Sequence, residues 1–271
     1  MTNIDQVAVV AKQDSERAAA TAAEVKRWLR DRGVSVADAD SSQVGLILVL
    51  GGDGTLLSVA RNRPGVPIVG VNLGTLGYLA EIGREGLYAN LGAILEGRFE
   101  VEERLLLDVE LKREAGTVSR YRALNDAVVH KSALARMIHL EVEIDGEPVA
   151  FYRSDGLIVS TPTGSTAYSL SAGGPILYPT LPVALLTPIS PHTLSMRPIV
   201  VPETSTIAMT LGSRDEEVYL TLDGQEGARL GGGDQVVVTA SGSRALQDRR
   251  PTCRSRDAEV CLICTESLHS S

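Results

Sequence analysis

A short glycine-rich segment, Gly51-Gly52-Asp53-Gly54-Thr55, directly follows the apolar run 44–50. Glycines leave the main chain bare, so a phosphate can approach backbone N–H groups that side chains would otherwise block. An apolar run without alternation is typical of a buried parallel strand, and ligands of open α/β sheets bind where such strands end. A tight turn in which Asp53 caps a helix is the structural alternative. The strand before the glycines and the helical pattern after them favour phosphate binding.

Two other segments have polar side chains where a core would not need them. Residues 161–175 are dense in hydroxyl groups and glycines. Such hydroxyls can hold a ribose or a purine, although a polar surface loop would have the same composition. Asn125 and Asp126 interrupt the apolar run 123–129. They mark either a β-bulge or a pair of side chains that point into a site.

Several familiar kinds of site and location are disfavoured by the sequence. No Gly-Lys pair occurs, which excludes a Walker A loop, and no Gly-x-Gly-x-x-Gly follows a predicted strand. The formal charge is 26 − 34 = −8, which argues against a broad surface for duplex nucleic acid. No apolar run approaches the roughly 20 residues that span a bilayer. The first ten residues do not read as a secretory signal, so we expect a cytoplasmic protein.

The first hundred residues alternate apolar runs with helical patterns, which predicts an α/β domain around a mostly parallel sheet. Strands are expected at 7–10, 44–50 and 66–71. Asp14 or Ser15 can cap a helix after the first strand. The apolar residues of this helix recur at helical spacing, at Ala18, Ala22, Val25 and Leu29.

From about residue 100 the apolar runs become shorter and are separated by turn residues, as in a β-sandwich. Asp145-Gly146 is a hairpin signal. The runs are 105–111, 122–129, 137–144, 149–153, 156–160, 206–211, 218–222 and 235–239. We therefore predict an α/β domain at 1–100, a β-rich domain at 101–240 and a divergent tail at 241–271, part of which could join the first domain.

Together, these segments resemble the NAD kinase family. Lipid kinases and phosphofructokinases resemble the glycine-rich segment alone, whereas its combination with the stretch 163–169 is specific. The matching segments stand in the family's order and cover roughly residues 44–240. They are 51–55, 125–126, 151–176, 191–195 with 197–198, and 223–225.

The resemblance implies phosphoryl transfer from ATP, or from inorganic polyphosphate in some members, to the 2′-hydroxyl of the adenosine ribose of NAD. Asp53 matches the family's catalytic aspartate, which accepts the hydroxyl proton, and Gly54 adds a main-chain contact. A divalent cation, Mg²⁺ or Mn²⁺, is expected on the donor phosphates, without assigned ligands from the protein. Family members form homodimers or homotetramers in which a neighbouring subunit helps to complete the site. The expected phosphate-donor loop consists of Gly51, Gly52, Gly54 and Thr55.

The resemblance also implies a set of NAD-contacting residues. Many members have Glu where Asp126 stands, and the shorter side chain could shift the ribose contact. Arg136 and Arg153 suit a pyrophosphate on charge alone. The full set is Asp53, Gly54, Asn125, Asp126, Arg136, Arg153, Asp155, Thr166, Ala167, Tyr168, Ser169, Leu170, Ser171 and Gln225.

The resemblance ends at two places. Thr75 replaces an Arg that is common in the family, so that contact is missing or supplied elsewhere. After Val238 the match is lost: family members finish with a segment that returns to the first domain, whereas 241–271 shows no apolar period. The tail holds Cys253, Cys261 and Cys264, at spacings that fit no common zinc finger.

Two other functions stay open at this point. A lipid kinase of the diacylglycerol kinase type would share the glycine–aspartate segment, but no apolar or basic membrane face is evident. A non-catalytic NAD(P) sensor would keep the pocket and lack the activity. We expect NAD and a phosphate donor as partners, and neither nucleic acid nor a membrane.

Overall fold

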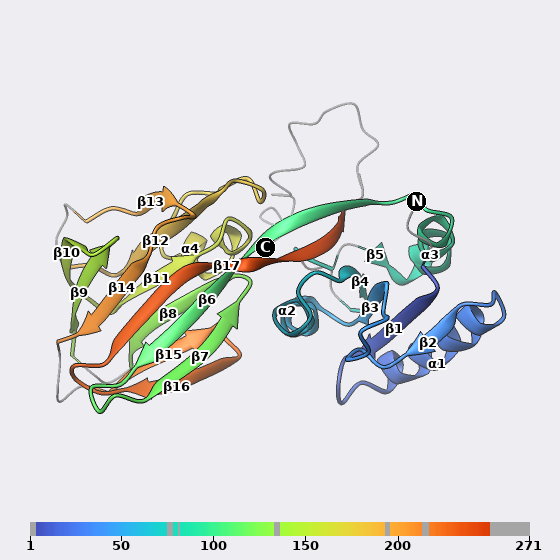
Figure 1. Ribbon diagram of the computed structural model, residues 1–271, viewed down its shortest axis with the longest axis horizontal. Coiled ribbons are helices and arrows are strands. Elements are labelled where there is room, and N and C mark those ends of the chain that lie inside the picture. The colour runs from blue at the N-terminus through green and yellow to red at the C-terminus, as the bar shows by residue number, and fades with distance from the viewer. Residues whose placement is uncertain are drawn as a thin grey trace, which may run out of the picture.

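Two layered regions lie side by side in the protein (Figure 1), a helix-covered parallel sheet and a pair of largely antiparallel sheets. This arrangement confirms the predicted fold class. The computed structural model describes residues 4–74, 78–80, 82–132, 136–192, 196–212 and 217–249. The expectations for Thr75, for residues 193–195 and for the tail cysteines lie outside the described residues.

The amino-terminal sheet is parallel, in the order β2-β1-β3-β4, with the short β5 beside β4. All five residues of β3 are buried, as expected of a central strand with both faces covered. The strands predicted at 7–10, 44–50 and 66–71 are confirmed, with small shifts at their ends. The observed strands are β1 (Gln6–Ala11), β2 (Ser35–Ala37), β3 (Leu46–Leu50), β4 (Pro67–Asn72) and β5 (Ile82–Gly83).

Helices cover both faces of this sheet. α1 (Glu16–Arg30) and α3 (Leu87–Leu95), the latter preceded by the 3₁₀ turn η1 (Arg84–Gly86), pack on one face. α2 (Asp53–Asn62) packs on the other face, and its apolar side chains also contact residues of the second region. No helix in the described ranges is long and apolar enough to cross a membrane.

The first helix begins where its sequence predicts. Ser15 is the N-cap of α1, and its side-chain oxygen accepts the N–H of Ala18 at 3.2 Å. The predicted apolar face is buried against the sheet, at Ala18, Ala22, Val25 and Leu29.

The carboxyl-terminal region packs one end of an 11-stranded sheet on a second sheet of six strands, in the order β13-β12-β11-β8-β15-β16. Apolar side chains from both sheets fill the core between them, as in β-sandwiches generally. The strands are β6 (Glu100–Lys112), β7 (Val118–Ala123), β8 (Asp126–Lys131), β9 (Ile138–Ile144), β10 (Glu147–Ser154), β11 (Gly156–Ser160), β12 (Val183–Ile189), β13 (Ile199–Pro202), β14 (Ile207–Leu211), β15 (Val218–Leu222), β16 (Glu226–Leu230) and β17 (Gln235–Arg249).

Most predicted β-segments correspond to one observed strand, but 122–129 is divided. The chain leaves the large sheet at the end of β7 and enters the small sheet with β8, so Leu124 and Asn125 form the crossing between the two sheets. The hairpin predicted at Asp145-Gly146 is confirmed, with φ values of +54° and +83° between β9 and β10. Sequence patterns did not indicate β12, β13 and β16.

β17 differs most from expectation. It pairs with β6 along most of its length, and its distal part also pairs parallel with β4, Leu246 with Pro67 and Gln247 with Ile68. Residues 241–249 therefore belong to an ordered strand that returns to the first domain, where a divergent tail was expected. A register shift between Ala240 and Arg244 breaks the alternation of side chains, which hid the strand in the sequence. Figure 1 shows β6 and β17 running together between the two regions.

Candidate active site

Asp53 is the first residue of α2, at the carboxyl edge of the parallel sheet. Its half-buried carboxylate accepts three backbone N–H groups from the segment after β4. The partners are Tyr78 at 2.8 Å, Leu79 at 3.1 Å and Ala80 at 3.0 Å. An ionised carboxylate has about four acceptor positions. Main-chain donors thus fix the carboxylate and leave room for about one further donor, such as a substrate hydroxyl.

The glycines around Asp53 differ in what they permit. A Cβ at Gly51 would lie 2.7 Å from Thr55 Oγ1, so Gly51 allows the strand and helix to pack closely. A Cβ at Gly52 would have no atom within 4 Å, so this part of the expected phosphate-donor loop faces open space. Gly54 is exposed, and its carbonyl accepts Gln225 Nε2 at 2.8 Å. Gly52 and Gly54 are therefore the positions where a phosphate can approach the main chain.

Asn125 and Asp126 are held by a carboxylate from another strand pair. Asp223 Oδ1 accepts the N–H of Asn125 at 2.7 Å and that of Asp126 at 3.1 Å, and Asp223 Oδ2 accepts the N–H of Leu124 at 3.1 Å. Asp223 lies in the turn between β15 and β16, with φ at +51°. The sheet crossing that divides β7 from β8 therefore depends on Asp223, which sequence analysis noted only within a motif.

Asp126 has an unusual carboxyl group. The residue is 4% exposed, and no hydrogen bond to its carboxyl oxygens is found within the described part of the chain. Burial, together with the negative charge of Asp223, raises its pKa from 3.8 to about 7. Near neutral pH this group can therefore donate or accept a proton.

The hydroxyl-rich loop lies at the end of the small sheet where β8 begins and β11 ends. Thr166 ends the 3₁₀ turn η2 (Thr163–Thr166), Ala167 follows it, and the remaining predicted contacts form the single helical turn α4 (Tyr168–Ser171). A Cβ at Gly164 would lie 2.1 Å from the carbonyl oxygen of Asn125. Only glycine at 164 lets this loop lie directly on the Asn125 main chain.

Several hydroxyls of the loop hold the loop itself. Thr161 Oγ1 donates to the carbonyl of Leu124 at 2.6 Å, and Ser169 Oγ contacts Thr187 Oγ1 at 2.8 Å. By contrast, Ser160 Oγ and Thr163 Oγ1 are buried and have no hydrogen-bond partner among the described residues. Ser160 pairs with Asp126 in the β8–β11 ladder, so their side chains lie on the same face of the sheet. Buried polar groups rarely stay unpaired, which makes this face a place for polar atoms of a ligand.

Arg136, Arg153 and Asp155 lie apart from these residues. Asp155 precedes β11 and accepts Lys131 Nζ at 3.5 Å, whereas Ser160 and the hydroxyl-rich loop are at the other end of the strand. At about 3.3 Å per residue, some 16 Å separates the two ends. Within one chain, the predicted NAD contacts thus form two groups, one near Asp53 and one around Asp155.

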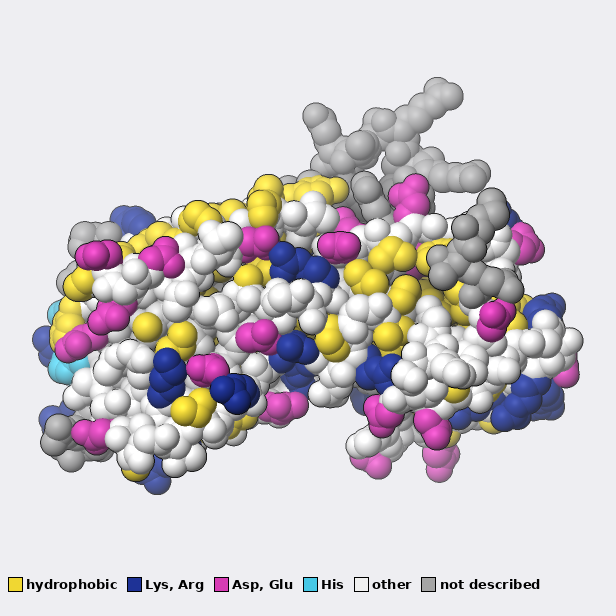
Figure 2. Space-filling view, in the orientation of Figure 1, with side chains coloured by type: hydrophobic (Ala, Val, Ile, Leu, Met, Phe, Trp, Pro, Cys, Tyr) yellow, Lys and Arg dark blue, Asp and Glu magenta, His cyan; other side chains and the backbone are white. Residues whose placement is uncertain are grey.

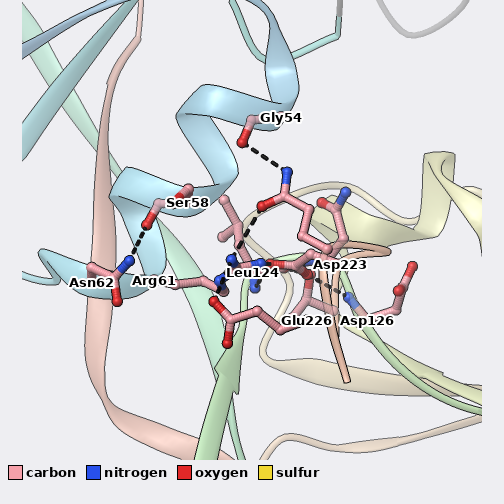
Figure 3. A network of polar contacts seen from close by, with 11 residues as sticks. Gly54, Ser58, Arg61, Asn62, Leu124, Asp126, Asp223 and Glu226 are labelled. Carbon is pink, nitrogen blue, oxygen red and sulfur yellow. Dashed lines mark hydrogen bonds and ion pairs between the residues drawn. The ribbon is translucent and has the colours of Figure 1, made fainter. Parts of the chain in front are cut away.

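A residue that sequence analysis missed, Arg61, links α2 to the turn after β15. It donates from Nη1 to Asp223 Oδ2 at 3.0 Å and from Nη2 to Gln225 Oε1 at 3.1 Å and Glu226 Oε1 at 3.0 Å (Figure 3). Arg61 lies four residues after the buried Leu57, on the apolar face of α2. An arginine on an apolar helix face was the available signal, because a buried cation needs a paired carboxylate.

A cavity of about 680 Å³ lies at the far end of α2 from Asp53. Its charged lining is arranged in ion pairs, which are Arg61–Glu226 at 3.0 Å, Arg122–Asp108 at 2.8 Å and Arg120–Glu110 at 2.9 Å. The carboxylates thus already neutralise these arginines.

The donor set around Asp53 was compared with the needs of a divalent cation. Among the described residues, no three His, Cys, Asp or Glu side chains come together as a protein cage would require. Mg²⁺ usually keeps several waters and binds one or two carboxylates plus substrate phosphates. The open glycine loop fits that mode with phosphate oxygens and waters as the ligands, because Asp53 keeps only about one acceptor position.

Comparisons with known proteins identify the family of this chain. The model of the ATP-NAD kinase N-terminal domain matches residues 38–99, and that of the ATP-NAD kinase C-terminal domain matches residues 124–247. The chain belongs to the NAD kinase family. It is 44% identical to the NAD kinase of Geotalea daltonii over 93% of this chain and 94% of that protein. It is 48% identical to the NAD kinase of Magnetococcus marinus over 83% of this chain and 73% of that protein. Its activity is NAD phosphorylation.

Solved structures of NAD and NADH kinases share the fold. Yeast NADH kinase complexed with NADH matches with a TM-score of 0.83 and 26% identity, over 92% of this chain and 84% of that chain. An NAD kinase from Archaeoglobus fulgidus in complex with ATP matches with a TM-score of 0.75 and 28% identity, over 90% of this chain and 93% of that chain. The C-terminal model reaches residue 247, so the family likeness includes the part of β17 that was expected to be divergent.

Proposed function

We propose that the protein transfers the γ-phosphate of ATP to the 2′-hydroxyl of the adenosine ribose of NAD at Asp53. The hydroxyl oxygen forms a bond to the γ-phosphorus, the bond from that phosphorus to the β–γ bridging oxygen breaks, and ADP leaves. The Asp53 carboxylate takes the hydroxyl proton. The observation that carries this proposal is the fixed Asp53 carboxylate, which has about one acceptor position left beside an open glycine loop.

Asp53 acts mainly by orienting the hydroxyl. Phosphoryl transfer passes through a loose transition state, so alignment and charge neutralisation matter more than a strong base. Three backbone donors hold the carboxylate in one orientation. The main chain at Gly52 and Gly54 receives the donor phosphates. A divalent cation on these phosphates would neutralise negative charge. Asp53 is the carboxylate within this loop, between Gly52 and Gly54.

Asn125 and Asp126 hold the NAD next to Asp53. Gln225 joins the two parts, because it contacts Gly54 and lies two residues after Asp223, the residue that binds the 124–126 main chain. The unpaired hydroxyls of Ser160 and Thr163 provide further polar contacts under the loop. Thr166, Ala167, Tyr168, Ser169, Leu170 and Ser171 form the wall above them.

The second group of predicted contacts serves a neighbouring copy in a homo-oligomer. Asp155 lies about 16 Å along β11 from the first group, and Arg153 lies on β10, which ends just before Asp155. Exposed apolar side chains surround the hydroxyl-rich loop, and Figure 2 shows such side chains gathered along the upper edge of the sandwich. The exposed apolar side chains of the loop and of the segment that follows it are Tyr168, Leu170, Ile176, Tyr178 and Leu181. Covering them with a second copy would bury apolar surface beside the site.

The deciding experiment uses the purified chain with NAD, γ-labelled ATP and Mg²⁺ in single-turnover conditions. We expect one label per NAD consumed, in a product that a dehydrogenase specific for the 2′-phosphate reduces. An NAD analogue with a 2′-deoxyadenosine should take up no label. Polyphosphate in place of ATP tests the donor, and chelation with EDTA tests the cation.

The two alternatives have distinct outcomes in this experiment. A chain that binds NAD in calorimetry but forms no NADP with either donor would be a sensor. Label transfer to diacylglycerol would indicate a lipid kinase, which the comparisons with known proteins do not support. The cytoplasm, where both substrates are available, stays the expected location.

A further inference from the structure

Arg61 connects the helix that carries Asp53 with the turn that follows β15. Its side chain is 4% exposed, and that of its partner Asp223 is 0% exposed, so water does not compete for this ion pair. Within the described residues, Arg61 is the one cation that contacts Asp223. Breaking a buried pair leaves an uncompensated charge, so each partner strongly restricts the position of the other.

Asp223 uses its full hydrogen-bonding capacity in this arrangement. Its two oxygens accept the guanidinium of Arg61 and the backbone N–H groups of Leu124, Asn125 and Asp126. These four donors fill about four acceptor positions. A displacement of Arg61 therefore changes the position of a carboxylate that fixes three consecutive residues of the NAD-binding main chain.

Gln225 attaches the same turn to the other end of the helix. Its Oε1 accepts Arg61 Nη2 at 3.1 Å, and its Nε2 donates to the carbonyl of Gly54 at 2.8 Å (Figure 3). Gly54 and Arg61 are about 10 Å apart along the helix axis. One Gln225 side chain therefore contacts α2 both at its first turn and at Arg61.

We propose that Arg61 is a positioning residue that aligns the NAD-binding main chain at 124–126 with Asp53, through Asp223. The inference rests on the proposed function, since it assumes that the 2′-hydroxyl reacts at Asp53 while residues 124–126 hold NAD. A misplacement of about 1 Å between reacting groups can lower the rate about 100-fold. Arg61 therefore acts on the alignment of bound substrate, and its loss should lower kcat more than it raises the KM for NAD.

The test compares Arg61→Met and Arg61→Lys with the wild type, by kcat, the KM for NAD and circular dichroism. We expect kcat to fall about 10- to 100-fold in R61M, with the KM for NAD changed by less than about threefold. R61K keeps the charge but loses the forked geometry, so its kcat should lie between the two. If R61M does not fold, R61K decides the matter.

Arg63→Met is the matched control. Arg63 lies two residues further along the chain and, unlike Arg61, donates to a main-chain carbonyl, that of Ser41 at 2.9 Å, within the first domain. It makes no described contact with the turn after β15, so R63M should keep a kcat within about threefold of the wild type. A folded R61M or R61K with the kcat of R63M would overturn the inference. A raised KM with unchanged kcat would also overturn it.

Chemical rescue separates alignment from a general packing defect. The cavity next to Arg61 gives a small cation a path to the position of the missing side chain. Added guanidinium should therefore raise the kcat of Arg61→Ala. It should not change the kcat of Arg63→Ala. A kcat loss in R61A that guanidinium does not restore would indicate a packing defect and contradict the inference. Wild-type protein that forms no NADP would contradict the proposed function instead.

Discussion

At the residue scale, the two carboxylates of the site are held in opposite ways. Asp53 accepts three backbone N–H groups, whereas the buried carboxyl group of Asp126 accepts none in the described structure. Donors keep Asp53 in a fixed orientation, while burial and the nearby Asp223 charge keep a proton on Asp126 up to about pH 7. Replacing Asp53 by Asn and replacing Asp126 by Asn should therefore have different effects on the protein.

Asp53→Asn should lower turnover by orders of magnitude, because the amide neither keeps the orientation in which the carboxylate holds the hydroxyl nor takes the hydroxyl proton. The NH₂ group would also face the N–H groups of residues 78–80, so we expect a loss of stability of about 1–3 kcal/mol. NAD affinity should stay largely intact, as calorimetry can check. Asp40→Asn, at a side chain fully exposed to solvent, is the control. Near wild-type turnover of D53N would remove Asp53 from the chemistry.

Asp126 should make the protein less stable as the pH rises. The unfolded chain releases this proton near pH 3.8, but the folded protein keeps it until about pH 7. The unfolded state therefore binds fewer protons in this window, and the free energy of unfolding falls by up to about 4 kcal/mol. Asp126→Asn should remove this fall, as urea denaturation at pH 5 and pH 8 can measure.

Asp234 provides a control of opposite sign. Burial acts to raise its pKa, but the N–H groups of Gly231 and Glu114 and the Arg113 guanidinium outweigh burial and lower the pKa. Its contribution to stability is present above pH 4 and is lost on acidification. Asp234→Asn should therefore destabilise the protein at pH 8, where D126N stabilises it. An identical pH dependence in D126N and wild type would contradict the role given to Asp126.

Sequence could identify Asp53, Asn125 and Asp126 because their types are unexpected beside apolar strands. It could not identify the partners that hold them. Arg61 and Asp223 are 162 positions apart in the chain, and only the folded structure brings them together. The pairing depends on the crossing between two sheets, which no local pattern encodes.

At the element scale, the loop that contains η2 and α4 depends on its contact with the Asn125 main chain. In Gly164→Ala the new methyl group would lie 2.1 Å from the Asn125 carbonyl oxygen, so one of the two segments must move. We expect a loss of about 1–3 kcal/mol in stability and a higher KM for NAD. Gly92→Ala in α3 is the control. Its new methyl group would have no atom within 4 Å, so the stability of the protein should stay the same or rise. A G164A enzyme with wild-type KM and stability would contradict this close packing.

β17 reaches the Asp53 region through Gln247. Its Nε2 donates to the carbonyl of Leu79 at 2.8 Å, and the N–H of Leu79 donates to Asp53 Oδ1 at 3.1 Å. Gln247→Leu leaves that carbonyl unpaired and loosens the segment that orients Asp53. We expect kcat to fall about 3- to 10-fold. Gln235→Leu, at the start of the same strand, is the control. Equal kcat values for the two variants would show that the Gln247 contact does not affect the chemistry.

Sequence patterns predicted best those helices and strands whose burial follows one regular pattern along the element. The buried strand β3 is an uninterrupted apolar run, and the amphipathic α1 has apolar residues at helical spacing. Of β17, only 235–239 was predicted as a strand, because Ser241, Gly242 and Ser243 lie where its register is irregular and its inward residues beyond them include the polar Gln247. A strand of this kind shows no alternation of apolar residues in its sequence, although β6 and β4 both pair with it.

At the scale of the whole molecule, the two groups of predicted NAD contacts make a test of shared sites possible. If a second copy supplies Asp155, then D53N and Asp155→Asn damage different halves of each site. Mixing the two inactive variants and letting subunits exchange should restore about a quarter of the activity in a dimer. Native mass spectrometry gives the subunit number in parallel. No recovery in exchanged oligomers would show that each copy supplies its whole site.

The pairing of β17 with β14 near its start and with β4 near its end also bears on how the protein is made. On the ribosome, β4 emerges long before β17, so the nascent α/β region exposes the edge of β4 that β17 later covers. Open strand edges invite wrong pairing, and contacts between distant segments form slowly. The Leu79 contact of Gln247 forms only when β17 docks, so a released chain should gain activity in one late folding step. A chaperone that shields strand edges would therefore raise the yield of active enzyme.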